Sequence, residues 1–119
     1  SEEDITGYAH TTCGDNRFEE FLVDAVRRTD GRARKLMIEA ARRGDGIDQK
    51  KMVATHSVPL AVINGRDEAL VNNAYLQQLD YANLWRNEIY LVDDAGHAPF
   101  WDRPELFNQL LRDFLAETA

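Results

Sequence analysis

The sequence predicts an α/β protein in which a helical segment precedes a parallel strand-helix-strand-helix unit. Three observations support this fold class. Apolar residues recur with helical spacing through the first half of the chain. Two continuous apolar runs, 58–65 and 88–96, are typical of strands that are buried on both faces. A strongly amphipathic segment closes the sequence.

The first half is expected to be helical. Ser1 is a possible N-cap of a short helix at the start of the chain. Two amphipathic helices should follow, with a hairpin at Asp30 and Gly31 and a C-terminal cap at Gly44. Their apolar stripes consist of Phe18, Phe21, Leu22, Ala25 and Val26 and of Ala33, Leu36, Met37, Ala40 and Ala41. A shorter helical piece is expected over 49–54.

The second half contains the predicted strands. The run 58–65 ends in a turn signal, and 88–96 forms a second run of the same kind. A helix candidate over 72–79 lies between them, so the two strands should be parallel and joined by a right-handed crossover. We find no third strand, although parallel sheets are stable only with more strands and covered faces. The sheet is therefore expected to be incomplete.

The final segment predicts a long helix. Asp102 is its expected N-cap, Pro104 lies in its first turn, and Glu105 stands at capping-box distance. Its apolar face is formed by Leu106, Phe107, Leu110, Leu111, Phe114 and Leu115.

Composition excludes several classes of function. The chain has 119 residues and a formal net charge of -7, with interleaved charges, which argues against nucleic acid or an anionic membrane as a partner. No apolar run is long enough to span a bilayer. A single cysteine, Cys13, permits no internal disulfide, which fits a reducing, cytoplasmic setting.

Titratable groups follow both predicted strands. Asp67 and Glu68 come just after the first strand, and His97 comes just after the second. Loops that leave the carboxyl ends of parallel strands meet in one crevice. A carboxylate there would orient the imidazole of His97 and stabilise its charged form, as in a nucleophile-histidine-acid triad.

The stretches "VPLAVINGRDEALVNNAYLQQL" and "IYLVDDAGHAPFWDRPELFNQLLRDFL" together resemble the C-terminal end of the α/β-hydrolase fold. This resemblance implies that His97 is the general base and acid, and that Glu68 is the triad acid, with Asp67 as the alternative. It also implies a cap-like helical segment over 1–57 and a part of the hydrolase core over 58–119. The implied substrate is a small organic molecule.

The nucleophile of that family is not found in this sequence. No Gly-x-Nuc-x-Gly turn follows a strand: Ser1 is terminal, Ser57 precedes a strand, and Cys13 lies in helix-turn sequence. We therefore expect the nucleophile, the oxyanion hole and most of the sheet to lie upstream of Ser1. Without the nucleophile, ester, amide, carbon-carbon, epoxide and haloalkane cleavage all stay open.

Alternative interpretations accompany these residues. Phe100 and Trp101 either line a substrate pocket beside His97 or pack against the closing helix. Asp93, Asp94 and His97 lack a second ligand pair, so neither a metal nor an organic cofactor is expected. The alternative is a non-catalytic module, and in either case the open strand edge predicts self-association or pairing with the missing part.

Overall fold

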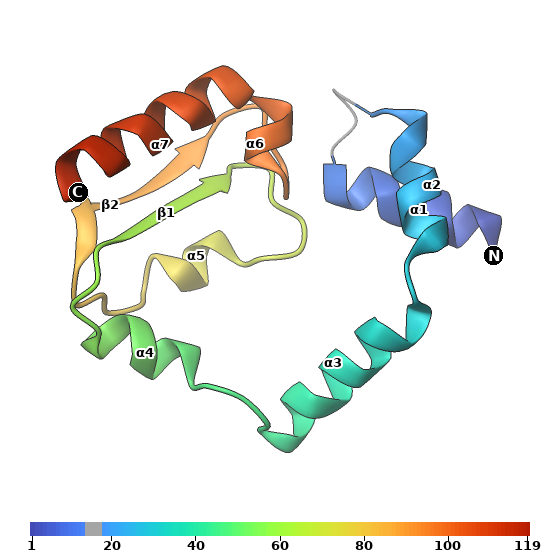
Figure 1. Cartoon of the computed structure of the whole chain (residues 1–119), viewed down its shortest axis with the longest axis horizontal. Helices are drawn as coiled ribbons and strands as arrows, with labels where there is room; N and C mark the ends of the chain where they lie inside the picture. Colours follow the sequence, from blue (N-terminus) through green and yellow to red (C-terminus); the bar gives the residue numbers. More distant parts are fainter. Residues whose placement is uncertain (14–17) are drawn as a thin grey trace.

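The computed structural model describes residues 1–13 and 18–119, and for Cys13 it describes the main chain alone. The element order is α1 (Glu2–Cys13), α2 (Glu20–Arg28), α3 (Gly31–Arg43), α4 (Gln49–Thr55), β1 (Leu60–Gly65), α5 (Asn73–Leu76), β2 (Leu84–Val92), α6 (Pro99–Asp102) and α7 (Pro104–Thr118). The predicted α/β class and the order of its elements are confirmed. Figure 1 shows the strand unit with α7 beside it, and a separate helical part formed by α1 and α2.

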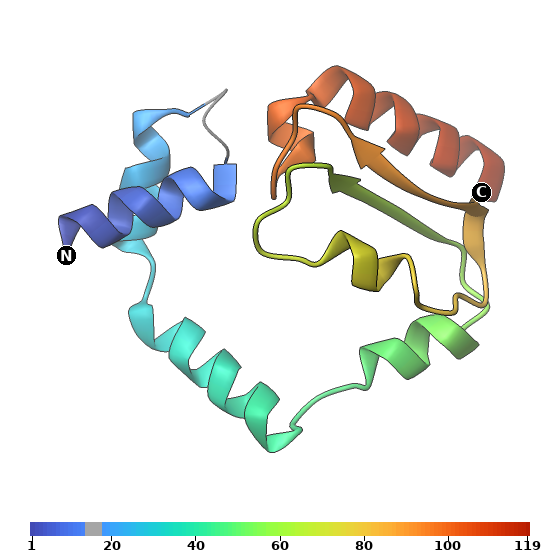
Figure 2. The same ribbon diagram turned by 180° about the vertical axis from the view of Figure 1, so that it is seen from behind.

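The helical part begins as the sequence predicts. The hydroxyl oxygen of Ser1 accepts a hydrogen bond from the Asp4 amide at 3.2 Å, so Ser1 caps α1. The expected hairpin between the two amphipathic helices is wrong, because α2 packs against α1 while α3 leads away from it (Figures 1 and 2). Asp30 caps α3 by accepting from the Arg32 amide, and Gly44 ends α3 with a left-handed φ of 76°.

The apolar stripe of α3 is not covered by the described residues. Leu36 and Met37 are 61% and 63% exposed. An amphipathic helix is stable when its apolar face is buried against another element. The face that α3 presents is therefore suited to a surface outside the described part of this chain.

The two strands are parallel neighbours and form the only sheet in the described residues. Pairing is regular from Val62 and Ile89 to Gly65 and Val92. The second strand begins at Leu84 and ends at Val92, so the expected bounds of 88–96 are wrong at both ends. The apolar pattern does not indicate the first residues of this strand, because the register shifts there. Arg86 and Asn87 have φ values of 53° and 54° at this irregularity.

The closing helix packs along β2 and contributes the main aromatic contacts. Trp85 is 5% exposed, and its ring meets Phe114 edge to face at 5.7 Å. The indole nitrogen of Trp85 donates to Glu117 at 2.8 Å, which joins the start of β2 to the end of α7. The small core continues through Val92, Ala95 and Ala98, and so extends toward the end of the strands where His97 lies.

Asp102 does not cap the closing helix. A short helix, α6, intervenes between His97 and α7, and the N-cap position of α7 belongs to Arg103, which makes no side-chain cap bond. Asp102 is instead 4% exposed, and its Oδ2 accepts from the Gly96 amide at 2.9 Å. The expected capping box is wrong because this aspartate turns inward to the preceding loop.

Candidate active site

The site lies where both strands end, at one edge of the sheet. Gly65 and Val92 are paired in the last register position, so the segments after them leave the sheet together. Two main-chain hydrogen bonds then join these segments: the Arg66 amide donates to Val92 at 2.9 Å, and the Asp67 amide donates to Ala95 at 3.0 Å. The sequence prediction that both loops share one crevice agrees with this arrangement.

His97 and Glu68 are in direct contact. Nδ1 of His97 lies 2.7 Å from Oε2 of Glu68. The Glu68 side chain is fully shielded from solvent, whereas 39% of the His97 side chain is exposed. The carboxylate is therefore enclosed behind the imidazole, and the imidazole forms the accessible part of the pair.

The environment of Glu68 favours its ionised form. Burial raises the pKa of this carboxyl, but hydrogen bonds from the Leu70 amide, His97 and the Val71 amide outweigh burial, so the pKa lies below its ordinary value. The Leu70 amide donates to Oε1 at 2.6 Å. Because an ionised carboxylate only accepts, Nδ1 of His97 must carry the hydrogen. Nε2 then presents a lone pair and can take a proton.

Asp67 takes a different position. In the part of the chain that the structure describes, Glu68 is the carboxylate that contacts His97, and Asp67 joins the site through its main-chain amide. The Asp67 side chain is exposed, and the pKa of the neighbouring Arg66 is raised mainly by its hydrogen bond to Asp93, with a smaller contribution from the charge of Asp67. Arg66 itself forms an ion pair with Asp93. The structure thus brings together Glu68 and His97 and leaves Asp67 beside them.

Phe100 and Trp101 lie on α6, directly after the His97 loop. Phe100 is 58% exposed and meets Phe107 of α7 edge to face at 5.9 Å. Trp101 is half-buried and meets Phe21 of α2 at 5.7 Å. Phe100 therefore packs against the closing helix, whereas Trp101 connects the neighbourhood of His97 to the helical part of the chain.

The other candidate nucleophiles and metal ligands lie elsewhere or are paired. The hydroxyl of Ser1 caps α1 and Ser57 is exposed ahead of β1. The side chain of Cys13 lies outside the described residues. Asp94 pairs with Arg103 at 3.0 Å. Within the residues described, no group of three or more histidine, cysteine, aspartate or glutamate side chains is placed to hold a metal ion.

Two residues of the site were missed by sequence reasoning. The sequence predicts only a turn at Gly65, but a Cβ at this position would lie 2.0 Å from the Gly96 carbonyl oxygen. The His97 loop therefore packs directly on the end of β1. The sequence predicts a helix cap at Asp102. Its bond to Gly96 has no signal in the sequence other than the nearby Pro99, which begins the unexpected helix α6.

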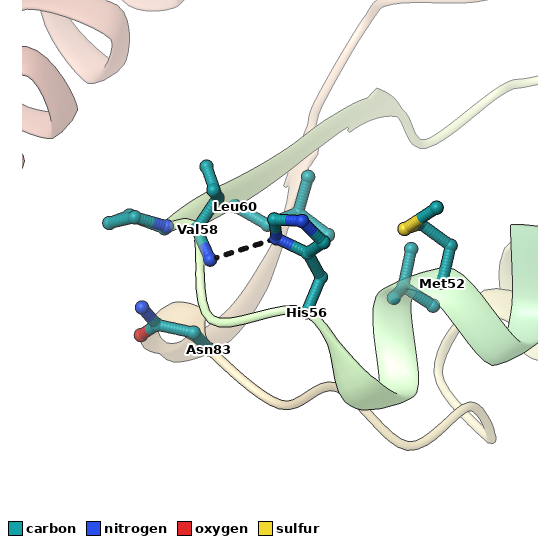
Figure 3. Close-up of a pocket in the computed structure, with 7 residues that line it drawn as sticks. Met52, His56, Val58, Leu60 and Asn83 are labelled. Atoms are coloured by element: carbon teal, nitrogen blue, oxygen red, sulfur yellow. Dashed lines mark hydrogen bonds between the residues drawn. The ribbon is translucent and has the colours of Figure 1, made fainter.

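An apolar groove of about 290 Å³ lies at the opposite end of β1 from His97. Figure 3 shows Met52, Val58 and Leu60 around it, with the His56 ring accepting a hydrogen bond from the Val58 amide at 3.3 Å. Because it adjoins the amino end of the strand, the groove does not form part of the His97 site.

Comparisons with known proteins place this arrangement in context. No family model and no curated protein matches the sequence. Three solved structures of the N-acyl homoserine lactonase AidH are similar to the whole of the chain. A serine-to-glycine variant complexed with N-hexanoyl homoserine lactone is 42% identical with a TM-score of 0.96, and 100% of this chain corresponds to 44% of that one.

The other two structures give the same result. AidH complexed with N-butanoyl homoserine is 42% identical, with a TM-score of 0.96 and 43% of that chain covered. A glutamate-to-glycine variant complexed with N-hexanoyl homoserine is 41% identical, with a TM-score of 0.95 and 43% covered. The chain thus spans less than half the length of these relatives. Its fold is that of the C-terminal part of an α/β-hydrolase.

Proposed function

We propose that this chain supplies the base and the acid of an α/β-hydrolase that opens N-acyl homoserine lactones or similar small esters. The contact between His97 and Glu68 carries this proposal, because an ionised, enclosed carboxylate on Nδ1 leaves Nε2 as the accessible base. The likeness to a lactonase over the whole chain supports the ester among the bond types that the sequence leaves open.

The proposed reaction assigns one role to each residue. Nε2 of His97 takes the proton of a nucleophile that the rest of the enzyme supplies, and the nucleophile forms a bond to the lactone carbonyl carbon. The ring carbon-oxygen bond then breaks, and His97 gives its proton to the departing oxygen. Water, activated by the same imidazole, cleaves the acyl intermediate and restores the nucleophile. Glu68 stabilises the charged imidazole in both steps.

The nucleophile and the remaining sheet are proposed to lie in sequence beyond these 119 residues. Two observations support this: the chain corresponds to 44% of the AidH chain, and its described sheet has two parallel strands. The exposed apolar residues Leu36 and Met37 on α3 would then face the remainder of the enzyme. We propose 1–57 as a cap-like segment and 58–119 as a part of the core.

Lactone hydrolysis measured by chromatography tests the proposal. The 119-residue chain alone should give no turnover, and the chain joined to the upstream part of its gene should hydrolyse N-hexanoyl homoserine lactone. His97→Ala should abolish that activity, at a loss of more than about 10³-fold. The matched control is His56→Ala, which removes an exposed histidine at the far end of β1 and should retain activity. A joined enzyme that stays inactive, or one indifferent to His97→Ala, would contradict the proposal.

A further inference from the structure

Asp102 is a buried carboxylate, and among the described residues only one of its two oxygen atoms has a hydrogen-bond partner. It is 4% exposed, and its Oδ2 accepts from the Gly96 amide at 2.9 Å. Its other oxygen, Oδ1, is buried and has no hydrogen-bond partner among the residues that the structure describes. A buried acceptor without a donor lowers stability, by about 1 to 3 kcal/mol in typical proteins. Stability alone therefore does not account for an aspartate at this position.

The bond to Gly96 holds the residue directly before His97. Gly96 is also held from the other side, because its carbonyl oxygen lies so close to Gly65 that no side chain fits there. Ala95, one residue earlier, is 2% exposed and accepts from the Asp67 amide at 3.0 Å. The peptide groups that lead into His97 are thus fixed between the end of β1 and the end of α6.

We propose that Asp102 is a positioning residue that orients the Gly96–His97 segment so that Nδ1 of His97 meets Glu68. The effect of Asp102 on catalysis rests on the proposed function. Its effect on the orientation of the imidazole does not depend on activity. The imidazole is 39% exposed, so its direction depends strongly on the main chain that carries it. Without the Asp102 carboxylate, the Gly96 amide loses its hydrogen-bond acceptor. The main chain before His97 is then less constrained, and the imidazole samples other orientations.

Nuclear magnetic resonance of the imidazole nitrogens in the 119-residue chain tests this role. Long-range proton-nitrogen spectra distinguish the two neutral tautomers of His97, and a low-field proton resonance reports Nδ1–H bonded to a carboxylate. The native chain should hold the Nδ1–H tautomer. Asp102→Ala should remove the low-field resonance and mix the tautomers, while Asp102→Asn, which keeps an acceptor for Gly96, should restore both signals. Glu105→Ala, an exposed carboxylate in the next helix, is the matched control.

A measurement on the unmodified chain covers the case in which Asp102→Ala does not fold. The Gly96 amide should exchange with solvent at least about 10-fold more slowly than the exposed Asp93 amide, because it is hydrogen-bonded and partly buried. Equal exchange rates would overturn the inference, as would a folded Asp102→Ala chain with unchanged imidazole signals. In the joined enzyme, Asp102→Ala should lower kcat by about 10- to 100-fold with KM nearly unchanged.

The outcomes for the two proposals are distinct. A native chain without any Nδ1–H resonance for His97 would contradict the proposed pair and hence the proposed function. A native resonance that survives Asp102→Ala would contradict the positioning role alone. Loss of activity in Asp102→Ala without rescue by Asp102→Asn would also count against the positioning role. The hydrogen-bond acceptor for the Gly96 amide would then not explain the loss of activity.

Discussion

Glu68 and His97 stand 29 residues apart in the sequence, and their side chains meet at 2.7 Å across the ends of two parallel strands. Each residue follows its own strand by a few positions, so the pairing of Gly65 with Val92 sets the distance between them. The pair is asymmetric, with an enclosed carboxylate and an accessible imidazole. In the proposed reaction, this asymmetry would let the ring transfer a proton while its partner stays charged.

The first prediction separates the two neighbouring carboxylates. In the joined enzyme, Glu68→Gln should lower kcat by about 10²- to 10⁴-fold, because a neutral amide neither fixes the tautomer of His97 nor stabilises its charged form. Asp67→Asn, which changes a carboxylate one residue away that faces solvent, should stay within about threefold of the native rate. Steady-state lactone hydrolysis checks both variants, and the reverse ranking would make Asp67 the triad acid.

The second prediction concerns the pH dependence of stability. The folded pKa of Glu68 lies below its ordinary value of 4.5. The stability that this shift contributes is fully present above the unfolded pKa and is lost as the pH falls through the lower folded pKa. The difference in free energy of unfolding between the native chain and Glu68→Gln should therefore be smaller below about pH 4.5 than at pH 5 to 6. Urea titrations at each pH measure it, and a constant difference down to pH 3 would contradict the shift.

Much of this site was predictable because strand ends and turn residues leave local signals. The apolar run before Gly65 located β1, and the parallel pairing that followed from the intervening helix brought Glu68 toward His97. The resemblance ranks Glu68 ahead of Asp67, but the apolar pattern does not separate them, since a one-residue change in the path of the loop exchanges them. In the structure, the Asp67 amide donates to Ala95 and the residue is exposed.

The third prediction tests the close approach at the end of β1. Gly65→Ala should destabilise the chain by about 1 to 3 kcal/mol, because the new Cβ would overlap main-chain oxygen atoms of Ala95 and Gly96. Gly96→Ala is the matched control, since the nearest atoms to its Cβ lie at 3.8 Å, and should stay within about 0.5 kcal/mol. Equilibrium unfolding in urea provides the comparison. Equal effects of the two variants would show that the loop is not packed on Gly65.

The fourth prediction concerns the contact between β2 and α7. Trp85→Ala should lower the free energy of unfolding by about 3 to 5 kcal/mol, because it removes a ring that is 5% exposed and packs against Phe114. Met37→Ala, at a position that is 63% exposed, should change stability by less than about 0.5 kcal/mol. Thermal unfolding followed by circular dichroism measures both. A small effect at Trp85 would mean that the closing helix is held by other contacts.

The fifth prediction concerns assembly of the isolated chain. β1 pairs with β2 along one side, and its other edge has no strand partner in the described residues. Such an edge and the exposed apolar face of α3 favour association between copies. Sedimentation velocity of the 119-residue chain should show dimers or larger species whose share grows with concentration. A single monomeric species across the range would contradict this expectation and the non-catalytic, self-associating alternative.

The errors of the sequence prediction share a physical cause. Helical periodicity identified α2 and α3, but it does not say which surface covers an apolar stripe, and the hairpin was inferred from a short turn at Asp30 alone. Likewise, the aspartate before Arg103 and Pro104 has the composition of a helix cap. Its contact with Gly96 depends on the short helix α6, which the local pattern does not indicate.

The register shift in the sheet has a consequence for engineering. Leu60 pairs with Leu84, and the next pair is Val62 with Ile89. Between these two pairs β2 contains more residues than β1, and regular pairing begins only after this bulge. Insertions or deletions at the exposed Asn87 and Glu88 should therefore leave the strand pairing at the carboxyl ends of β1 and β2 unchanged. This makes the bulge a suitable place to graft a peptide tag or a fluorescent reporter, at a distance from Glu68 and His97.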